Sequence, residues 1–396
     1  MSVTAARGFV AAGGAIGIKS GGVPDLAVVA TAHGRAVPAA GVFTQNLAAA
    51  APVQVSRAHL AATGGSAAGV VLSSGNANAA TGPAGVEAAE ALCRLTAVAI
   101  GASTEEILVC QTGLIGVPFP AGVLDAVPAV VGARAGGPDA GAAAATAIMT
   151  TDTVRKEAVT TVGTAGGTAG GPCIVGGMAK GAAMLAPNMA TMLAVLTTDA
   201  EADAATLHRV LRGAVRASFN EMTVDGATST NDTVLLLASG LAGPVETDAL
   251  AGAVALVCSE LAAAMVADAE GATKVARVTV SGAASDAEAH RAARKVASSL
   301  LVKCSLNGAD PYWGRVVSEL GSAGVGFDLD RVSVRYGGIE VCRAGMAAGH
   351  DGAAVAAHMA GRHVEISCDL GLGSGRGAVL TTDLGYGYID ENRTTS

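Results

Sequence analysis

The sequence contains few aromatic and few charged residues. Of its 396 residues, 3% are Phe, Trp or Tyr and 15% are charged, whereas 51% are hydrophobic and 54 are glycine. Much of any core must therefore consist of small side chains and close backbone contacts. A chain of this length can bury a sizeable core in one large domain or two medium ones. These proportions favour a closely packed protein over a disordered one.

Clusters of basic residues are also absent. The net charge is −8, the isoelectric point is near 5.4, and no stretch is rich in Lys or Arg. Nucleic acids and anionic membranes bind positive surfaces, so we expect neither partner and favour a small molecule. The uncharged, largely apolar residues 181–198 include Pro187 and Asn188 and are marginal for crossing a bilayer. We interpret them as buried backbone of an active site.

The cysteines do not form a recognisable disulfide pattern. There are seven of them, none in a Cys-x-x-Cys pair, and the odd number argues against a complete disulfide framework. Residues 1–10 lack the continuous apolar run of a secretory signal. We therefore expect a cytoplasmic protein with reduced, mostly buried thiols. The cysteines are Cys93, Cys110, Cys173, Cys258, Cys304, Cys342 and Cys368.

Hydrophobic periodicity indicates a mixed α/β protein. Apolar residues recur at three- and four-residue intervals from Leu207 to Phe219, which predicts an amphipathic helix. Residues 121–147 predict a helix followed by a loop around Gly137. Alternation about a Gly-Gly pair in residues 331–342 predicts a hairpin. The other predicted elements are strands at 26–30, 70–72, 107–109, 363–370 and 377–382, and helices at 85–100, 248–269 and 286–301.

The sequence lacks several common catalytic motifs. It contains no Gly-x-Ser-x-Gly, no His-Glu-x-x-His, no phosphate-binding loop and no dinucleotide-binding fingerprint. Its seven histidines lie far apart along the chain. A histidine-based triad and a zinc site are therefore not favoured.

Residues 180–199, KGAAMLAPNMATMLAVLTTD, contain a different candidate nucleophile. An amino-terminal threonine can use its own α-amine as the base, so that it needs no histidine. Thr191 would become such a terminus if it attacked the carbonyl of Ala190 and the chain were cut between the two residues. On residue type alone, a threonine in an apolar run is more often an ordinary strand residue.

The segment MAKGAAMLAPNMATMLAVLTTDA, which starts at Met178, closely resembles the self-processing motif of a known family. This is the glutamate N-acetyltransferase and ornithine acetyltransferase family of arginine biosynthesis. Further motifs of the family occur in the same order along the whole chain, which makes a chance similarity untenable. They are GVFTQN at Gly41, SGNANAATGPAG at Ser74, QTGLIG at Gln111, AIMTTDT at Ala147, TSTNDTVLLLASG at Thr228, DAEGATK at Asp268 and DPYWGRV at Asp310.

The resemblance implies a reaction and its catalytic residues. Thr191 would carry an acetyl ester that passes from N2-acetylornithine to glutamate. Thr112 and Gly113 would form the oxyanion hole, in which a hydroxyl and a backbone N–H stabilise the charge on the acyl oxygen. Without the resemblance, these two residues would be interpreted as a turn after strand 107–109. No metal or organic cofactor is implied, and acetyl-CoA stays open as a second donor.

The resemblance also implies a fold and an assembly. We expect an α/β, self-processing enzyme of the amino-terminal-nucleophile type with two domains. These are the amino-terminal fragment, residues 1–190, and the carboxy-terminal fragment, residues 191–396, which bears the nucleophile. The two fragments are expected to stay associated, share one active site and assemble as a heterotetramer with two copies of each.

A further set of residues is implied to bind the substrate. N2-acetylornithine carries a carboxylate, which Lys180 would neutralise, and a distal ammonium group, which Glu270 would accept. In isolation, either residue would more often be a solvated surface charge. The substrate-binding residues implied by the resemblance are Thr150, Lys180, Thr191, Glu270, Asn392 and Ser396.

Two departures from the family pattern leave other functions open. Tyr312 stands where the family has Asn, and the tail from Asn392 to Ser396 is one residue short and lacks an aromatic residue. One alternative is a paralogous acyltransferase of specialised metabolism with another acceptor. Another is an amidohydrolase or peptidase, in which water replaces the acceptor amine. A non-catalytic binding protein with this fold is a third alternative, against which the retained Thr191 and Lys180 argue.

Overall fold

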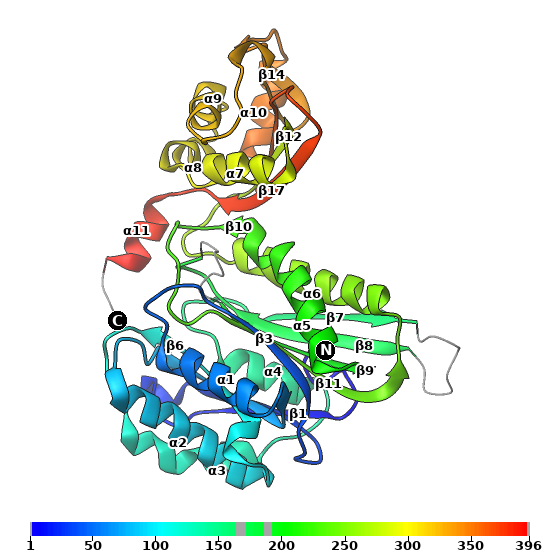
Figure 1. The fold of residues 1–396 in the computed structure, drawn as a ribbon. Helices are drawn as coiled ribbons and strands as arrows, with labels where there is room; N and C mark the ends of the chain where they lie inside the picture. The colour runs from blue at the N-terminus through cyan, green and yellow to red at the C-terminus, as the bar shows by residue number, and fades with distance from the viewer. Residues whose placement is uncertain (1, 164–171, 186–191, 394–396) are drawn as a thin grey trace. The chain divides into compact units, whose positions relative to one another are not determined.

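The computed structural model describes residues 2–163, 172–185 and 192–393. The predicted nucleophile Thr191 and the terminal Ser396 lie outside these residues. Helices and strands alternate along the described chain (Figure 1). The predicted mixed α/β class is therefore confirmed.

The chain forms two compact units. Unit 1 comprises Met1–Asn220 and Ala227–Met265, and unit 2 comprises Glu221–Gly226 and Val266–Ser396. The predicted cut after Ala190, a residue outside the described ranges, would fall within the sequence of unit 1. Compact units and fragments are different divisions of the chain, and the two fragments stay a prediction.

Unit 1 contains a four-stranded and a six-stranded sheet. Across the first sheet, the strands are β1 (Phe9–Gly14), β2 (Leu26–Thr31), β5 (Gly69–Asn76) and β6 (Ile107–Leu114). Across the second, they are β4 (Ser66–Ala67), β3 (Val37–Phe43), β11 (Thr233–Pro244), β9 (Leu193–Glu201), β8 (Cys173–Lys180) and β7 (Lys156–Val162). The pairs β5–β6 and β9–β11 are parallel, and the other neighbours are antiparallel.

The two sheets of unit 1 pack face to face. Leu108 of β6 and Val195 of β9 belong to the core between them. The opposite face of the four-stranded sheet packs against α2 (Gly82–Ile100) and α3 (Val127–Gly132). Because both faces of this sheet are covered, its strand β2 is a nearly continuous apolar run, LAVVAT, without polar alternation. All residues of β2, for example, are buried.

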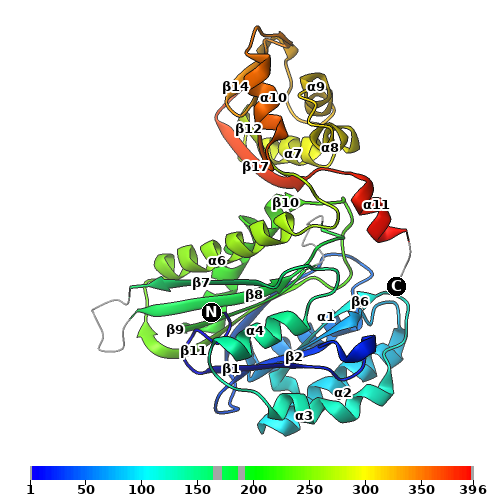
Figure 2. The same cartoon turned by 180° about the vertical axis from the view of Figure 1, so that it is seen from behind.

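Helices cover the outer face of the six-stranded sheet (Figure 2). Val257 of α6 (Thr247–Ala267) lies so close to Gly177 of β8 that a β-carbon on the glycine would come within 3.0 Å of it. Among the described residues, α6 is the one helix that is long and apolar enough to cross a bilayer. Half of its most apolar window is buried inside the fold, as is common for core helices.

The amphipathic helix expected after Asp199 is α5 (Ala204–Arg216). The side chain of Asp203 accepts a hydrogen bond from the main-chain N–H of Thr206, which satisfies one of the unpaired donors of the first turn. Leu207 and the other apolar residues of its periodic face are buried. The predicted helix is confirmed, but it ends at Arg216, and Phe219 lies beyond it.

Two predicted helices have different bounds in the structure. The predicted loop around Gly137 is short, and a further helix, α4 (Pro138–Ala147), begins with a proline at a position whose N–H needs no helical partner. The predicted helix 286–301 is divided into α7 (Asp286–Ala297) and α8 (Leu300–Asn307). Ser299 has extended backbone angles and caps α8 by accepting from the N–H of Val302.

Unit 2 contains one seven-stranded sheet. The predicted hairpin is confirmed, with Gly337 and Gly338 at positive φ angles of 55° and 80°, as a tight turn between two strands requires. The sheet packs against α7 and its neighbours around an apolar core. In order, the strands are β10 (Met222–Thr223), β17 (Gly375–Thr382), β12 (Val275–Ala283), β16 (His363–Asp369), β13 (Ser333–Tyr336), β14 (Ile339–Arg343) and β15 (Met346–Ala347).

The remaining elements are short helices and 3₁₀ turns. In unit 1 they are η1 (Ser20–Gly22), α1 (Ala51–Ala62), η2 (Thr104–Glu106) and η3 (Ala121–Ala126). In unit 2 they are α9 (Trp313–Gly321), η5 (Leu329–Arg331), α10 (Gly352–Ala360) and α11 (Tyr386–Asn392), while η4 (Phe219–Glu221) joins the two units in sequence.

Candidate active site

Lys180, the last residue of β8, lies at the centre of a polar cluster in unit 1. Its Nζ donates to Thr150 Oγ1 at 2.7 Å and to Thr112 Oγ1 at 3.2 Å. Lys180 and Thr112 are each only 4% exposed. The fold therefore brings together three of the predicted site residues, which come from three separate segments of the chain.

Asp152 is the buried counter-ion of this cluster. It accepts from Lys156 Nζ at 2.6 Å and from the main-chain N–H groups of Gly181 and Thr150 at 2.7 and 3.0 Å. Its Oδ2 lies 4.0 Å from Lys180 Nζ. Burial by itself raises the pKa of Asp152, but the charges of Lys180 and Lys156 outweigh it and lower the pKa to about 2. The carboxyl is therefore anionic at neutral pH.

Lys19 is a second ammonium group near the cluster. Its Nζ donates to the carbonyl of Met149 at 2.6 Å and to that of Pro24 at 3.1 Å. Burial lowers the pKa of Lys19, Asp25 opposes this shift, and Lys180 lowers the pKa further. The sequence prediction omitted Lys19 and Asp152. Asp152 lies within the quoted AIMTTDT motif, which is a signal that could have identified it.

The predicted oxyanion-hole residues, Thr112 and Gly113, lie near the end of β6. Gly113 has a φ angle of +135°, and a β-carbon there would come within 2.2 Å of the carbonyl carbon of Gly75. Only glycine therefore fits at this position. Thr112 is buried against Lys180, whereas Gly113 is exposed. The threonine hydroxyl and the open main chain of the glycine are thus adjacent.

Buried amides hold this part of β6 in place. Asn78 Nδ2 donates to Gln111 Oε1 at 2.8 Å, and Asn231 Nδ2 donates to the main-chain oxygens of Gln111 and Ala77 at 2.9 and 2.6 Å. Asn78 has a positive φ of 47°, a conformation that asparagine tolerates better than most residues. Fully paired buried networks of this kind make a site rigid.

Thr191 and Ala190 lie outside the described residues, but Met192, which follows them, is described. The N–H of Met192 donates to Asp232 Oδ1 at 3.0 Å, and its carbonyl accepts from the N–H of Thr233 at 3.1 Å. Burial raises the pKa of the Asp232 carboxyl well above its ordinary value, although the hydrogen bond from Met192 opposes this shift. The sequence prediction did not include Asp232.

The remaining predicted site residues lie in unit 2. Asn392 Nδ2 donates to Glu270 Oε2 at 2.6 Å and to the carbonyl of Tyr388 at 2.9 Å. Glu270 is half-buried and Asn392 is exposed. The predicted residues therefore form one group in each unit, while Ser396 lies outside the described residues.

Tyr312, the residue that departs from the family pattern, is also in unit 2. It is 55% exposed, and the guanidinium group of Arg315 lies 5.8 Å from the centre of its ring. This arrangement is a cation–π contact at the surface.

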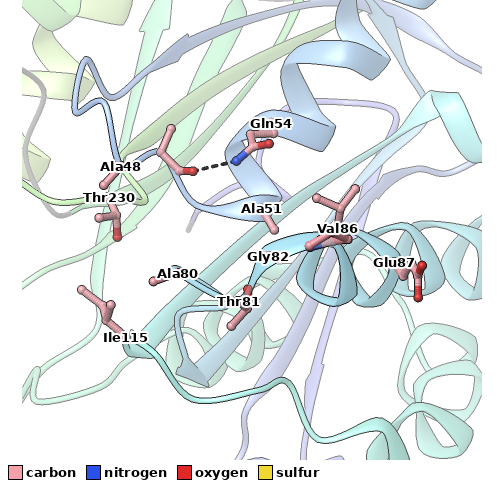
Figure 3. Close-up of a pocket in the computed structure, with 12 residues that line it drawn as sticks. Ala48, Ala51, Gln54, Ala80, Thr81, Gly82, Val86, Glu87, Ile115 and Thr230 are labelled. Atoms are coloured by element: carbon pink, nitrogen blue, oxygen red, sulfur yellow. Dashed lines mark hydrogen bonds between the residues drawn. The ribbon is translucent and has the colours of Figure 1, made fainter.

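A pocket of about 670 Å³ lies in unit 1 (Figure 3). One of its lining residues is Ile115, which lies three residues after Thr112 in the sequence. Two others, Gln54 and Ala49, are joined by a hydrogen bond from Gln54 Nε2 to the carbonyl of Ala49. Among the described residues, none of the predicted site residues lines it. The lining residues are Ala48, Ala49, Ala51, Gln54, Ala80, Thr81, Gly82, Pro83, Val86, Glu87, Ile115 and Thr230.

The described parts of the chain contain no group of three His, Cys, Asp or Glu side chains arranged to hold a metal ion. The cysteines are free thiols, and Cys304 alone among them is exposed. Their predicted burial is thus confirmed for six of the seven.

Comparison with known proteins identifies relatives over the whole chain. The model of the ArgJ family matches residues 10–394. The arginine biosynthesis bifunctional protein ArgJ of Mycolicibacterium paratuberculosis is 48% identical over 100% of this chain and 96% of its own length. The protein of the same description from Streptomyces coelicolor is 46% identical and is covered completely, as is this chain.

Two solved chains each match about half of this chain. A chain of the arginine biosynthesis bifunctional protein argJ from Bacillus halodurans is 35% identical, with a TM-score of 0.49 over 50% of this chain and 97% of that one. A chain of ornithine acetyltransferase complexed with ornithine from Mycobacterium tuberculosis is 38% identical, with a TM-score of 0.40 over 47% and 94%. Because the family model and the full-length relatives extend over nearly all of its sequence, the chain belongs to the ArgJ family.

Proposed function

We propose that this protein is a self-cleaving acetyltransferase that converts N2-acetylornithine and glutamate into ornithine and N-acetylglutamate. The main support is the buried cluster in which Lys180 donates to Thr112 and Thr150. Each of the three residues belongs to a different motif of the family. The relatives with known names are arginine biosynthesis bifunctional proteins, which agrees with this reaction.

The proposed first step produces the nucleophile. Thr191 Oγ attacks the carbonyl carbon of Ala190, so that an ester forms as the peptide bond breaks and the released nitrogen takes the hydroxyl proton. Water then hydrolyses the ester, which leaves a carboxylate on Ala190 and restores the hydroxyl of Thr191. Thr191 now carries a free α-amine, which can act as its base.

The proposed second step is acetyl transfer. Thr191 Oγ attacks the acetyl carbon of N2-acetylornithine, and the α-amine passes the hydroxyl proton to the leaving amine of ornithine. The amine of glutamate then attacks the acetyl ester and regenerates Thr191. Ping-pong kinetics follow, because one nucleophile serves donor and acceptor in turn.

Thr112 and Gly113 would stabilise the negative charge on the acyl oxygen in both steps. Thr112 Oγ1 accepts from Lys180, so its own O–H is available to donate. Asp152 would supply the negative charge that balances the Lys180 ammonium. Lys180 would also neutralise the substrate carboxylate, and Lys19 would add a second positive charge near Lys180.

Several finer features belong to the same proposal. Glu270 would accept the distal ammonium of N2-acetylornithine, and Asn392 and Ser396 would contribute to recognition. The two fragments would stay associated, two copies of each, in the cytoplasm, where free thiols persist. Acetyl-CoA would be a second donor, since the relatives are described as bifunctional proteins.

The decisive experiment is mass spectrometry of the purified protein after incubation with N2-acetylornithine alone. We expect two fragments and a gain of one acetyl group on the carboxy-terminal fragment. Parallel initial-rate lines with glutamate as the second substrate should accompany this gain. Release of acetate without glutamate would assign an amidohydrolase instead, and an intact chain without any acetyl gain would assign a binding protein.

A further inference from the structure

The segment between Thr228 and Thr233 joins the two sheets of unit 1 at the candidate site. Asn231 and Asp232 are its central residues, and they are 4% and 0% exposed. Their side chains bind different partners. Asn231 binds main chain around β6 of the four-stranded sheet, and Asp232 binds main chain at the start of β9 of the six-stranded sheet.

The contact of Asn231 lies directly beside the oxyanion residue. Its Nδ2 donates to the carbonyl of Gln111 at 2.9 Å, and Gln111 immediately precedes Thr112. The same amide donates to the carbonyl of Ala77 at 2.6 Å. One side chain therefore binds the main-chain oxygens of Gln111, in β6, and of Ala77, the residue that follows β5.

The contact of Asp232 lies directly beside the nucleophile in sequence. Its Oδ1 accepts from the N–H of Met192 at 3.0 Å, and Met192 immediately follows Thr191. The carbonyl of Met192 accepts from the N–H of Thr233 at 3.1 Å. Both main-chain polar groups of Met192 are thus bound by two consecutive residues of this segment.

The segment itself is firmly held. The N–H of Thr44 donates to the carbonyl of Asp232 at 2.9 Å, and its Oγ1 donates to the carbonyl of Ser229 at 2.7 Å. The N–H of Ala50 donates to the carbonyl of Thr230 at 2.9 Å. Because Thr44 and Ala50 bind the main-chain carbonyls of the segment, its side chains can hold their own partners in fixed positions.

We propose that Asn231 and Asp232 are positioning residues. Asp232 would fix Met192, the residue that follows the proposed nucleophile in sequence, and Asn231 would fix the main chain of Gln111 beside Thr112. This inference rests on the proposed function, because it takes Thr191 as the nucleophile. It adds two residues that act through their neighbours in the chain and not on the substrate.

The role of Asp232 is that of a hydrogen-bond acceptor. Burial raises the pKa of its carboxyl, which favours the neutral acid. An amide has the same shape as the neutral acid and keeps an oxygen to accept from Met192. Asp232→Asn should therefore preserve the position of Met192, whereas Asp232→Ala removes the acceptor altogether.

The test measures self-cleavage of the full chain, followed by kcat and KM for acetyl transfer in the cleaved fraction. We expect Asp232→Ala to slow cleavage and to lower kcat by about 10²-fold, as a displacement of about 1 Å can do, with KM little changed. Asp232→Asn should restore both rates to near the wild-type values. Asn231→Ala should also lower kcat, because it releases the main chain of β6 beside Thr112. This variant supplies the test if Asp232→Ala does not fold.

Asp199 provides a control. It is a buried carboxylate of β9, its Oδ1 accepts from the main-chain N–H of Ile174 at 2.7 Å, and its Oδ2 pairs with Arg7 Nε at 2.7 Å. Asp199→Ala should lower Tm at least as much as Asp232→Ala but leave the cleavage rate and kcat unchanged.

Three results would overturn the inference. The first is a cleavage rate and a kcat at the wild-type values in both Asp232→Ala and Asn231→Ala. The second is an Asp232→Asn variant whose cleavage rate and kcat are as low as those of Asp232→Ala. The third is a loss of kcat in Asp199→Ala equal to that in Asp232→Ala. Failure of the proposed function is distinguishable from these results. A wild-type protein that cleaves itself but gains no acetyl group would refute the acetyl transfer, while the cleavage rates of the variants would still test the positioning.

Discussion

Lys180 in unit 1 and Glu270 in unit 2 are both predicted to bind the substrate, but their surroundings differ. Lys180 is 4% exposed and is enclosed by Thr112, Thr150 and the anionic Asp152. Glu270 is half-buried and pairs with the exposed amide of Asn392. The unit 1 group is a preassembled interior network, whereas the unit 2 pair stays close to solvent.

This difference separates two kinds of contribution. A buried, paired charge is costly to disturb, because its removal leaves a partner without compensation in the interior. A charge near solvent is screened, and its removal costs little. We therefore expect large effects on chemistry and stability from unit 1 and small effects on donor preference from unit 2.

The largest effect is expected from Thr191→Ala. Because no other group can replace the nucleophile, the purified variant should run as a single band of 396 residues and show no acetyl gain. Gel electrophoresis and intact mass test this directly. Cleavage of the variant at the same bond would mean that an external protease makes the cut.

The next largest effect is expected from Thr112→Val. The change keeps the shape of the side chain but removes the hydroxyl, and the loss of one oxyanion donor typically lowers kcat by about 10²–10³-fold. KM for N2-acetylornithine should change little. An unchanged kcat with a raised KM would assign Thr112 to substrate binding and would weaken the contrast between the two units.

A smaller effect concerns pH and Asp152. The folded pKa of this carboxyl, about 2, lies below its ordinary value of 3.8, so its stabilisation is complete above pH 3.8 and is lost as the pH falls towards 2. The shift corresponds to about 2 kcal/mol of unfolding free energy. Urea unfolding between pH 7 and 2 should show this loss in the wild type.

Asp152→Asn is the variant that isolates this contribution. It should be less stable at pH 7, because Lys156 and Lys180 lose their anionic partner, and its stability should fall less between pH 4 and 2. The same slope in both proteins would show that other carboxyl groups cause the acid dependence.

The smallest effect is expected from Glu270→Gln. A partly exposed ion pair contributes about 1 kcal/mol or less, so kcat/KM for N2-acetylornithine should fall by about fivefold. A donor such as N-acetylnorvaline, which lacks the distal ammonium, should be unaffected, and self-cleavage should proceed as in the wild type. Equal losses for both donors would make Glu270 a structural residue, and a far larger selective loss would mean that the substrate is deeply desolvated there.

Local sequence patterns were sufficient for many elements of this fold. Asp203 and the apolar period that follows it define α5, and Gly337 with Gly338 defines the hairpin of unit 2. The division at Ser299 was missed, because the apolar spacing runs on across it and only the backbone angles of that serine end the helix. Hydrophobic periodicity indicates which face of a helix is apolar. It does not indicate where a serine side chain caps the next helix by hydrogen bonding to its main chain.

The sequence by itself determined the family and the mixed α/β class, and it predicted Thr112, Thr150 and Lys180 as site residues, because these properties reside in local motifs and in residue types. Only the tertiary structure decided which residues surround them. Asp152 becomes the anion beside Lys180, and Asp232 meets Met192, because strands distant in sequence pair and the two sheets of unit 1 pack face to face. Burial in that interior raises the pKa of both carboxyls, but the charges of Lys180 and Lys156 outweigh it at Asp152 and lower that pKa, whereas the pKa of Asp232 stays raised.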